Sequence, residues 1–297
     1  MNLRDHLLRG TSRSFYLSLR WLPGSVRDSI ALGYLLARAS DSIADASLAP
    51  LDRRVEALHA LRDGDIGTRI IDELASHQTK PAEQELVQNL PGLLDDLERS
   101  PDQAALQGVW SKILEGQIFD LVRFVQRPDA LTPDELDEYT YLVAGSVGEF
   151  WSTLCTQRIT DFSTMSAEPH KLLACNYGKG LQRVNILRDH RTDTAAGRPY
   201  LGPGRFEVER ATAHHQLNDG LEWVGAVRGG RMRLSAVLPA SIALEMLPRF
   251  SETADAVKLS RRAIRRHLFT AVPILWSSRW QPTSAHITAD GSREASR

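Results

Sequence analysis

The chain has 297 residues, of which 42% are hydrophobic, enough to bury a sizeable core in one large domain or two smaller ones. Its 36 lysines and arginines nearly balance 37 acidic residues, and the net charge of -1 does not favour nucleic acid as a partner. The two cysteines form neither a metal-binding pattern nor a disulfide framework, which fits a reducing compartment. Because no signal-like or membrane-spanning apolar run is found, we expect a cytoplasmic protein with at most peripheral membrane contact.

Apolar residues recur at helical spacing through most of the chain, and alternating strand-like runs are hard to find. We therefore expect an all-α protein. The expected helices cover residues 1–22, 25–45 (with Ser25 as N-cap), 51–76, 82–99, 103–126, 133–158, 169–194, 208–227, 231–247 and 251–277. One domain is expected over residues 1–280, and the polar stretch 281–297, which has little to bury, is expected to be disordered.

The clearest helix start lies at Thr132, where Thr132 is the expected N-cap, Pro133 the first helical residue and Glu135 the partner in a capping box. The helix that follows contains Gly145 and Gly148 well inside it, each costing roughly 1 kcal/mol relative to alanine. Their missing side chains would allow a close approach by either a neighbouring helix or a bound ligand. The sequence favours neither explanation.

Two acidic pairs stand out, because Asp-x-x-x-Asp occurs only twice in the chain, at Asp41/Asp45 and at Asp189/Asp193. Steps of three or four residues place each pair on one face of its expected helix. The same two faces carry further residues in register: Tyr34 and Arg38 before the first pair, and Gly178, Gln182 and Asn185 before the second. Taken singly, each pair could also be a solvated acidic stripe on a surface helix.

Carboxylate and amide oxygens at this spacing suit a hard divalent cation such as Mg²⁺, and two such helices could face each other across a bundle. Mg²⁺ held this way usually completes its coordination with phosphate oxygens of a substrate, which nearby arginines also bind. A diphosphate so held becomes a good leaving group, and the carbocation left behind needs a dry, aromatic-rich pocket. The acidic pairs therefore predict Mg²⁺-dependent chemistry on a diphosphate.

Four segments together resemble the squalene and phytoene synthase family in order and spacing. They are Thr-Ser-Arg-Ser-Phe (11–15), Tyr-Leu-Leu-Ala-Arg-Ala-Ser-Asp-Ser-Ile-Ala-Asp (34–45), Asp-Glu-Tyr-Thr-Tyr-Leu-Val-Ala-Gly-Ser-Val-Gly-Glu (137–149) and Gly-Lys-Gly-Leu-Gln-Arg-Val-Asn-Ile-Leu-Arg-Asp (178–189). Gly-Arg-Pro-Tyr-Leu (197–201) resembles the segment that follows the second acidic motif in that family. The resemblance covers roughly residues 10–270. It implies an all-α isoprenoid synthase fold, a helical bundle around a central cleft, and head-to-head condensation of two prenyl diphosphates.

The resemblance also implies roles for individual residues. Mg²⁺ would be held by Asp41, Asp45, Asn185, Asp189 and Asp193. Positions that contact diphosphate or cofactor in the family are matched by Arg13, Ser14, Arg38, Gln182 and Arg188. Tyr139 matches a tyrosine assigned to proton transfer or cation stabilisation. The prenyl tunnel would be lined by Phe15, Tyr34, Val143 and Val147, for which ordinary core packing is the alternative.

Two departures from the family pattern matter. Ala44 and Ala46 stand where squalene synthases commonly have acidic residues, which bears on the number of metal ions held there. Late in the chain, residues 257–262 resemble a Lys-Ile-Arg-Lys stretch used near NADPH, with Lys258 matching and Arg261 compensating for Ser260. A solvated basic helix face is the alternative interpretation of that stretch.

The sequence as a whole thus predicts an enzyme that joins two farnesyl diphosphates through presqualene diphosphate, a cyclopropyl intermediate, and reduces it to squalene with NADPH. A cofactor-free phytoene or dehydrosqualene synthase is the alternative. A non-catalytic helical binding protein is a third possibility, but four carboxylates kept together in a cleft repel one another without metal. No obligate protein partner is inferred.

Overall fold

The computed structural model describes residues 3–12, 19, 22–253 and 266–267. Within these ranges every regular element is helical, and an isolated antiparallel bridge joins Ser163 to Val227. The α-helices are α1 (Leu3–Thr11), α3 (Gly24–Ala44), α4 (Leu51–Asp63), α5 (Thr68–Ser76), α6 (Pro81–Gln88), α7 (Leu90–Glu98), α8 (Gln103–Gln126), α9 (Pro133–Thr140), α10 (Ser146–Arg158), α11 (Ala167–Ala195), α12 (Phe206–Ala226) and α13 (Gly230–Met246). A π-helix, η1 (Tyr141–Gly145), joins α9 to α10, and a 3₁₀ turn, η2 (Leu247–Arg249), follows α13. The all-α expectation is confirmed.

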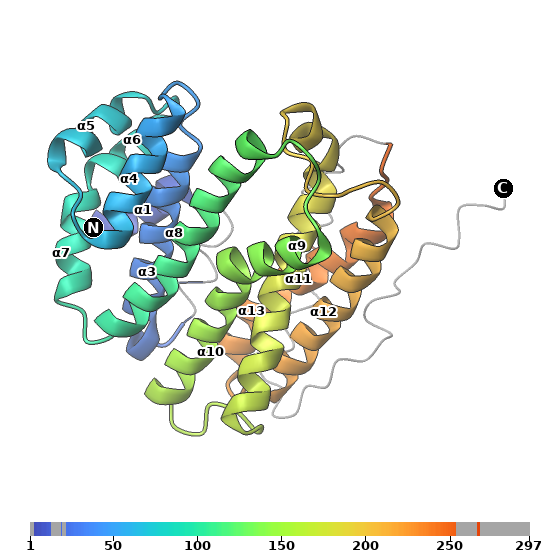
Figure 1. Cartoon of the computed structure of the whole chain (residues 1–297). Helices are drawn as coiled ribbons and strands as arrows, with labels where there is room; N and C mark the ends of the chain where they lie inside the picture. The colour runs from blue at the N-terminus through green and yellow to red at the C-terminus, as the bar shows by residue number, and fades with distance from the viewer. Residues whose placement is uncertain (1–2, 13–18, 20–21, 254–265, 268–297) are drawn as a thin grey trace.

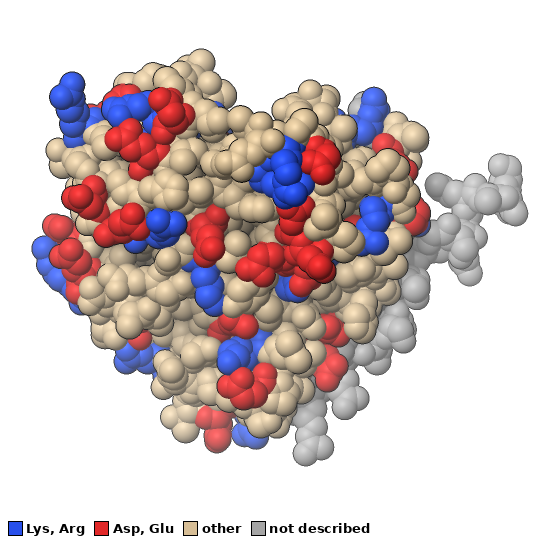
Figure 2. Space-filling model, viewed as in Figure 1, with Lys and Arg blue, Asp and Glu red and all other residues tan. Residues whose placement is uncertain are grey.

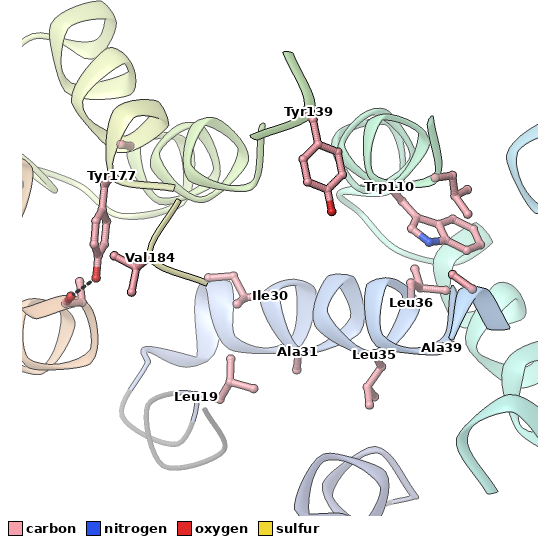
Figure 3. Close-up of a cluster of buried hydrophobic side chains, with 14 of the residues drawn as sticks. Leu19, Ile30, Ala31, Leu35, Leu36, Ala39, Trp110, Tyr139, Tyr177 and Val184 are labelled. Carbon is pink, nitrogen blue, oxygen red and sulfur yellow. Dashed lines mark hydrogen bonds between the residues drawn. The ribbon is translucent and has the colours of Figure 1, made fainter. Parts of the chain in front are cut away.

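The helices form two groups that meet along α3 and α8 (Figure 1). The short helices α4 to α7 lie beside α3 and α8, and the longer α10 to α13 pack against one another on the other side. One connected cluster of buried apolar residues runs through both groups, from Leu7 of α1 to Phe206 of α12. Figure 3 shows part of it, with Ile30 of α3, Trp110 of α8 and Tyr139 of α9. The helices that carry the expected site residues are therefore fixed by a common core.

Several helices differ in their ends from the sequence-based expectation. α3 begins at Gly24 after Pro23, with no side-chain cap, so the prediction of Ser25 as N-cap is wrong. The expected helix 51–76 is broken at Gly64, whose positive φ of 76° ends α4 in the left-handed region that glycine tolerates. The expected helix 82–99 is divided at Asn89, whose side-chain amide and backbone N–H both donate to the carbonyl oxygen of Glu85.

The expected helix 133–158 starts as predicted but is not uniform. Thr132 Oγ1 accepts from the Glu135 amide at 3.2 Å, and Glu135 Oε2 accepts from the Thr132 amide at 2.9 Å, which confirms the capping box. The helix then widens into η1. A neighbouring helix, α11, approaches the two internal glycines: a Cβ added at Gly148 would lie 2.0 Å from the carbonyl oxygen of Ala174.

Parts of the expected helices 1–22 and 251–277 lie outside the described residues, as does the stretch 281–297. In the first of these ranges α1 ends at Thr11. In the second, residues 251–253 are not helical, whereas residues 266–267 are. Among the residues that the structure describes, no helix is both long and apolar enough to cross a membrane. Acidic and basic side chains are interspersed on the face shown in Figure 2, in keeping with the net charge of -1.

Candidate active site

A cavity of about 860 Å³ runs along α3 and α8 and is called the main cavity below. Its volume lies in the upper part of the range of ligand pockets. The α3 residues that line it step by three or four positions and so share one face of the helix. They include Ile30, Gly33, Tyr34, Arg38, Asp41 and Asp45.

The cavity has one apolar and one charged end. Ile30 and Gly33 of α3 line the apolar end, where Phe150 of α10 lies next to Gly33: a Cβ added at Gly33 would be 3.8 Å from the Phe150 ring. Arg38 and Asp41 line the charged end. Eleven residues separate Ile30 from Asp41, which at 1.5 Å per residue is about 17 Å along the helix axis. The cavity therefore matches the polarity of a long molecule that has a charged head and a hydrocarbon tail.

The first acidic pair lies at the end of α3. Arg38 forms ion pairs with Asp41 and with Glu83 of α6. Burial raises the pKa of Asp41 to about 6, and the neighbouring negative charge of Asp45 adds to the shift. Asp45 is the C-cap residue of α3, is exposed and lines the same cavity. The protein therefore stabilises the negative charge of this pair only in part.

The second acidic pair lies near the end of α11 and is also paired with arginines. Arg188 donates to Asp189 from Nε at 2.9 Å. Arg198 donates from Nη2 to Asp193 at 2.9 Å and from Nη1 to Asp120 of α8 at 3.2 Å. Burial raises the pKa of Asp193 to about 6, an effect that Arg198 partly opposes. Because Arg198 lines the cavity, it connects this pair to the charged end of the cavity.

The two acidic pairs are not assembled into a ready-made metal centre. Over the described ranges, no three side chains of His, Cys, Asp or Glu come close enough together to hold a metal ion. Asp41 and Asp45 line the main cavity, whereas Asp189 and Asp193 do not. Metal binding by these four residues and Asn185 stays a prediction.

A smaller, apolar cavity of about 290 Å³ adjoins the first. Val143, Val147 and Gln182 line both cavities. Asn185 lines only the smaller one, and its amide donates to Gln182 Oε1 at 3.3 Å. The face of α11 that was predicted to be polar therefore begins beside the smaller, apolar cavity. Only its later residue Asp193 is linked to the charged end of the main cavity, through Arg198.

The π-helix explains how one side of α9 and α10 lines the main cavity. Tyr139, Val143, Val147 and Trp151 are four residues apart, and in a regular α-helix each such step turns by about 40° away from the previous residue. A π-turn contains more residues per turn and reduces this drift, so all four residues reach the cavity. Gly116 of α8 leaves room for the turn, since a Cβ there would lie 2.5 Å from Val143 Cγ1.

Tyr139 is held in an aromatic stack at the cavity wall. Its ring centroid lies 5.4 Å from that of Tyr200 with an interplanar angle of 25°, and 6.1 Å from that of Phe119. Tyr200 donates its hydroxyl hydrogen to Asp120. Burial, and then the charge of Asp120, raise the pKa of Tyr139 well above its usual range, so its hydroxyl stays protonated. In Figure 3 the ring extends from the end of α9 toward α3.

The sequence alone does not mark three of these residues as site residues: Asp120, Arg198 and Tyr200. Arg198 and Tyr200 belong to the Gly-Arg-Pro-Tyr-Leu segment, for which the resemblance implies no individual roles. Asp120 has no acidic residue four positions away and so gives no pattern. Tyr34 does line the cavity, and its hydroxyl lies 3.4 Å from the carbonyl oxygen of Thr11. The remaining predicted site residues lie outside the described part of the chain: Arg13, Ser14, Phe15, Lys258 and Arg261.

Comparisons with known proteins address the family and the fold of the chain. The family model described as squalene/phytoene synthase matches residues 8–203. The phytoene synthase of Mycobacterium bovis is 28% identical over 236 residues, which are 80% of this chain and 66% of that protein. The presqualene diphosphate synthase of Sinorhizobium fredii is 30% identical over 197 residues, 66% of this chain and 61% of that protein. The chain thus spans at most 66% of the length of these two relatives. Among solved structures, TcSQS bound to a ligand has a TM-score of 0.71 at 18% identity, over 92% of this chain and 87% of that chain, a likeness of fold.

Proposed function

Because the chain belongs to the squalene/phytoene synthase family, whose members are prenyltransferases, we propose that it condenses two farnesyl diphosphates head to head through presqualene diphosphate and reduces this to squalene with NADPH. The observation that carries the proposal is the polarity of the main cavity. Its apolar end accepts a hydrocarbon chain, and its charged end, with Arg38, Asp41 and Asp45, accepts a diphosphate with its counter-ions. The chain is therefore assigned a substrate with a charged head and a long apolar tail.

The oxygen donors of the two acidic pairs and Asn185 are of the chemical type that suits Mg²⁺, but the described residues do not bring three ligating side chains together at one point. The residues that would hold it are Asp41, Asp45, Asp189 and Asp193, with Asn185 assisting. Carboxylate and amide oxygens are the ligands that hard divalent cations prefer, and a partly buried carboxylate such as Asp193 is stabilised by positive charge nearby. When bound, Mg²⁺ would stabilise the negative charge that develops on a departing diphosphate.

The chain's own residues supply the rest of the proposed chemistry. Arg38 and Arg188 would bind phosphate oxygens with paired N–H groups, because a guanidinium matches phosphate geometry. Tyr139 would present its ring and its protonated hydroxyl to the carbocation, since its raised pKa disfavours the phenolate. The apolar wall that includes Val143 and Val147 would keep water away from the cation.

The proposed reduction with NADPH rests on the sequence resemblance alone, because Lys258 and Arg261 lie outside the described residues. A second candidate is therefore a cofactor-free synthase of the phytoene or dehydrosqualene type. The match to the phytoene synthase of Mycobacterium bovis favours this candidate, as it extends over 80% of the chain, against 66% for the presqualene diphosphate synthase.

One experiment separates the candidates. The protein is incubated with farnesyl or geranylgeranyl diphosphate and Mg²⁺, with and without NADPH, and the product is identified by mass spectrometry. Squalene formed only with farnesyl diphosphate and NADPH supports the first proposal. Phytoene or dehydrosqualene made at the same rate without NADPH supports the second. No diphosphate release from either substrate in the presence of Mg²⁺ would contradict both.

A further inference from the structure

The arginines predicted to bind phosphate at the charged end of the cavity already have carboxylate partners. Arg38 is paired with Asp41 and Glu83, and Arg188 with Asp189. Arg198, which the structure adds to this set, is paired with Asp120 and Asp193. Each of these guanidinium groups is therefore neutralised within the protein.

Arg54, in the first turn of α4, differs from them. It lines the same cavity, yet no described carboxylate lies within the 4.0 Å of an ion pair with it. Its guanidinium donates one hydrogen bond, from Nη1 to the carbonyl oxygen of Ala44 at 2.6 Å. Its Nε is buried and has no hydrogen-bond partner. A guanidinium has five N–H donors, so most of its hydrogen-bonding capacity is unused.

The surroundings of Arg54 place it at the charged end of the cavity. Burial lowers its pKa, the charge of Asp45 opposes that shift, and the charge of Arg198 adds to it. Arg54 therefore lies close enough to both residues to interact with their charges. Its bond to Ala44, the last residue of α3, fixes the guanidinium next to Asp45. Arg54 is partly buried, and taking a cation out of water without a carboxylate partner costs free energy that a bound anion would offset.

We propose that Arg54 binds the diphosphate of the prenyl diphosphate, as an additional anion ligand contributed by α4 between Asp45 and Arg198. This inference rests on the proposed function for the presence of a diphosphate in the cavity. The Ala44 carbonyl orients the guanidinium, and its remaining N–H groups are directed to phosphate oxygens. Unlike Arg38 and Arg198, Arg54 gives up no carboxylate when the anion binds, so its contact adds to affinity without an exchange of partners.

The test uses inorganic pyrophosphate as the probe, with the full chain and saturating Mg²⁺. Pyrophosphate affinity is measured by calorimetry for the parent protein and for two variants. Arg54→Met keeps an unbranched apolar stem without the charge, and Arg54→Lys keeps the charge without the planar fork. The matched control is Arg62→Met, at the other end of α4, where Arg62 pairs with Asp63 and does not line the cavity. Melting temperatures are recorded for all four proteins.

We expect Arg54→Met to weaken pyrophosphate binding roughly ten- to a hundredfold, the range for losing a hydrogen bond to a charged group. Arg54→Lys should lose less, and Arg62→Met should bind as the parent does. Parent-like affinity in Arg54→Met overturns the proposal, and so does an equal loss of affinity in Arg54→Met and Arg62→Met. If Arg54→Met fails to fold, Arg54→Lys against Arg62→Met decides alone, and an affinity equal to that of the parent overturns it. Arg54-dependent pyrophosphate binding in a protein that makes no hydrocarbon would contradict the proposed function and leave the role of Arg54 intact.

Discussion

Replacing Gly178 by alanine tests how tightly the site helices are packed. Gly178 lies on α11 where that helix crosses η1, and an added Cβ would lie 2.1 Å from the carbonyl oxygen of Ala144. Real Cβ atoms essentially never approach closer than 3.0 Å, so the two backbones must separate by at least 3.0 - 2.1 = 0.9 Å. The obstructing atom belongs to the main chain of a helix, and no change of side-chain rotamer can remove it. The strain must be taken up by moving one helix.

Two effects of opposite sign set the magnitude. Alanine is the better helix former by about 1 kcal/mol, which favours the variant. Overpacking of a rigid site typically costs about 1–3 kcal/mol and occasionally more. Because the obstructing atom is main chain, we place the overpacking cost in the upper part of this range, at about 2–3 kcal/mol. Gly178→Ala should then lose a net of about 1–2 kcal/mol of unfolding free energy, with a fall in melting temperature of about 2–4 °C per kcal/mol.

The matched control is Gly108→Ala. Gly108 lies inside α8, is exposed and has no atom within 4 Å of an added Cβ, so this variant should gain about 0.5–1 kcal/mol from helix propensity alone. Both variants are compared by urea unfolding and by turnover of farnesyl diphosphate. A shift of about 1 Å next to Val143 should lower turnover of Gly178→Ala by up to about a hundredfold. If Gly178→Ala were stabilised as much as Gly108→Ala, the close helix contact inferred from the geometry would be wrong.

Three further predictions follow from single residues. Thr132→Ala should lose about 1 kcal/mol of unfolding free energy in urea, because it removes one half of the capping box; an unchanged midpoint would show that the cap contributes nothing. Asp189→Asn should abolish turnover at an unchanged melting temperature, since its side chain is 38% exposed and no volume is lost; near-normal turnover with Mg²⁺ would contradict the metal-ligand prediction. Burial lowers the pKa of His170 from 6.5 to about 4, so the unfolded chain takes up the proton first. The contribution of neutral His170 to the free energy of unfolding is complete above pH 6.5. It decreases as the pH falls toward 4, by at most about 3 kcal/mol. In urea unfolding over this pH range, His170→Gln should not show that decrease.

Helical periodicity was sufficient to predict the fold class and most helices, because amphipathic spacing and Pro or Gly breaks are local signals. The interruptions were harder to predict. The residues of η1 have no composition that marks a π-helix. Its wide turn depends on Gly116, more than twenty residues earlier, which leaves room for the Val143 side chain. The break at Gly64 depends on a left-handed conformation that a glycine permits but does not require.

The candidate site was predictable where it repeats along a helix and unpredictable where it depends on tertiary contacts. Asp41 and Asp45, like Asp189 and Asp193, are marked by their spacing of four. Asp120 has no such mark, and it meets Arg198, 78 positions away, only because α8 and the segment after α11 come together in the fold. Arg54 likewise becomes distinctive only when the partners of the other arginines are known.

The ion pairs of the cleft suggest how substrate binding proceeds. The arginines held against Asp41, Asp189 and Asp193 offset part of the repulsion between the carboxylates in the unliganded chain. A diphosphate that takes Arg38 or Arg198 must therefore displace a carboxylate, and the displaced carboxylate then needs another cation. Binding of the anion and of a divalent cation would in this way favour each other, by reciprocal factors. Arg54 stands outside this exchange, so it can bind a diphosphate before any ion pair in the cleft is broken.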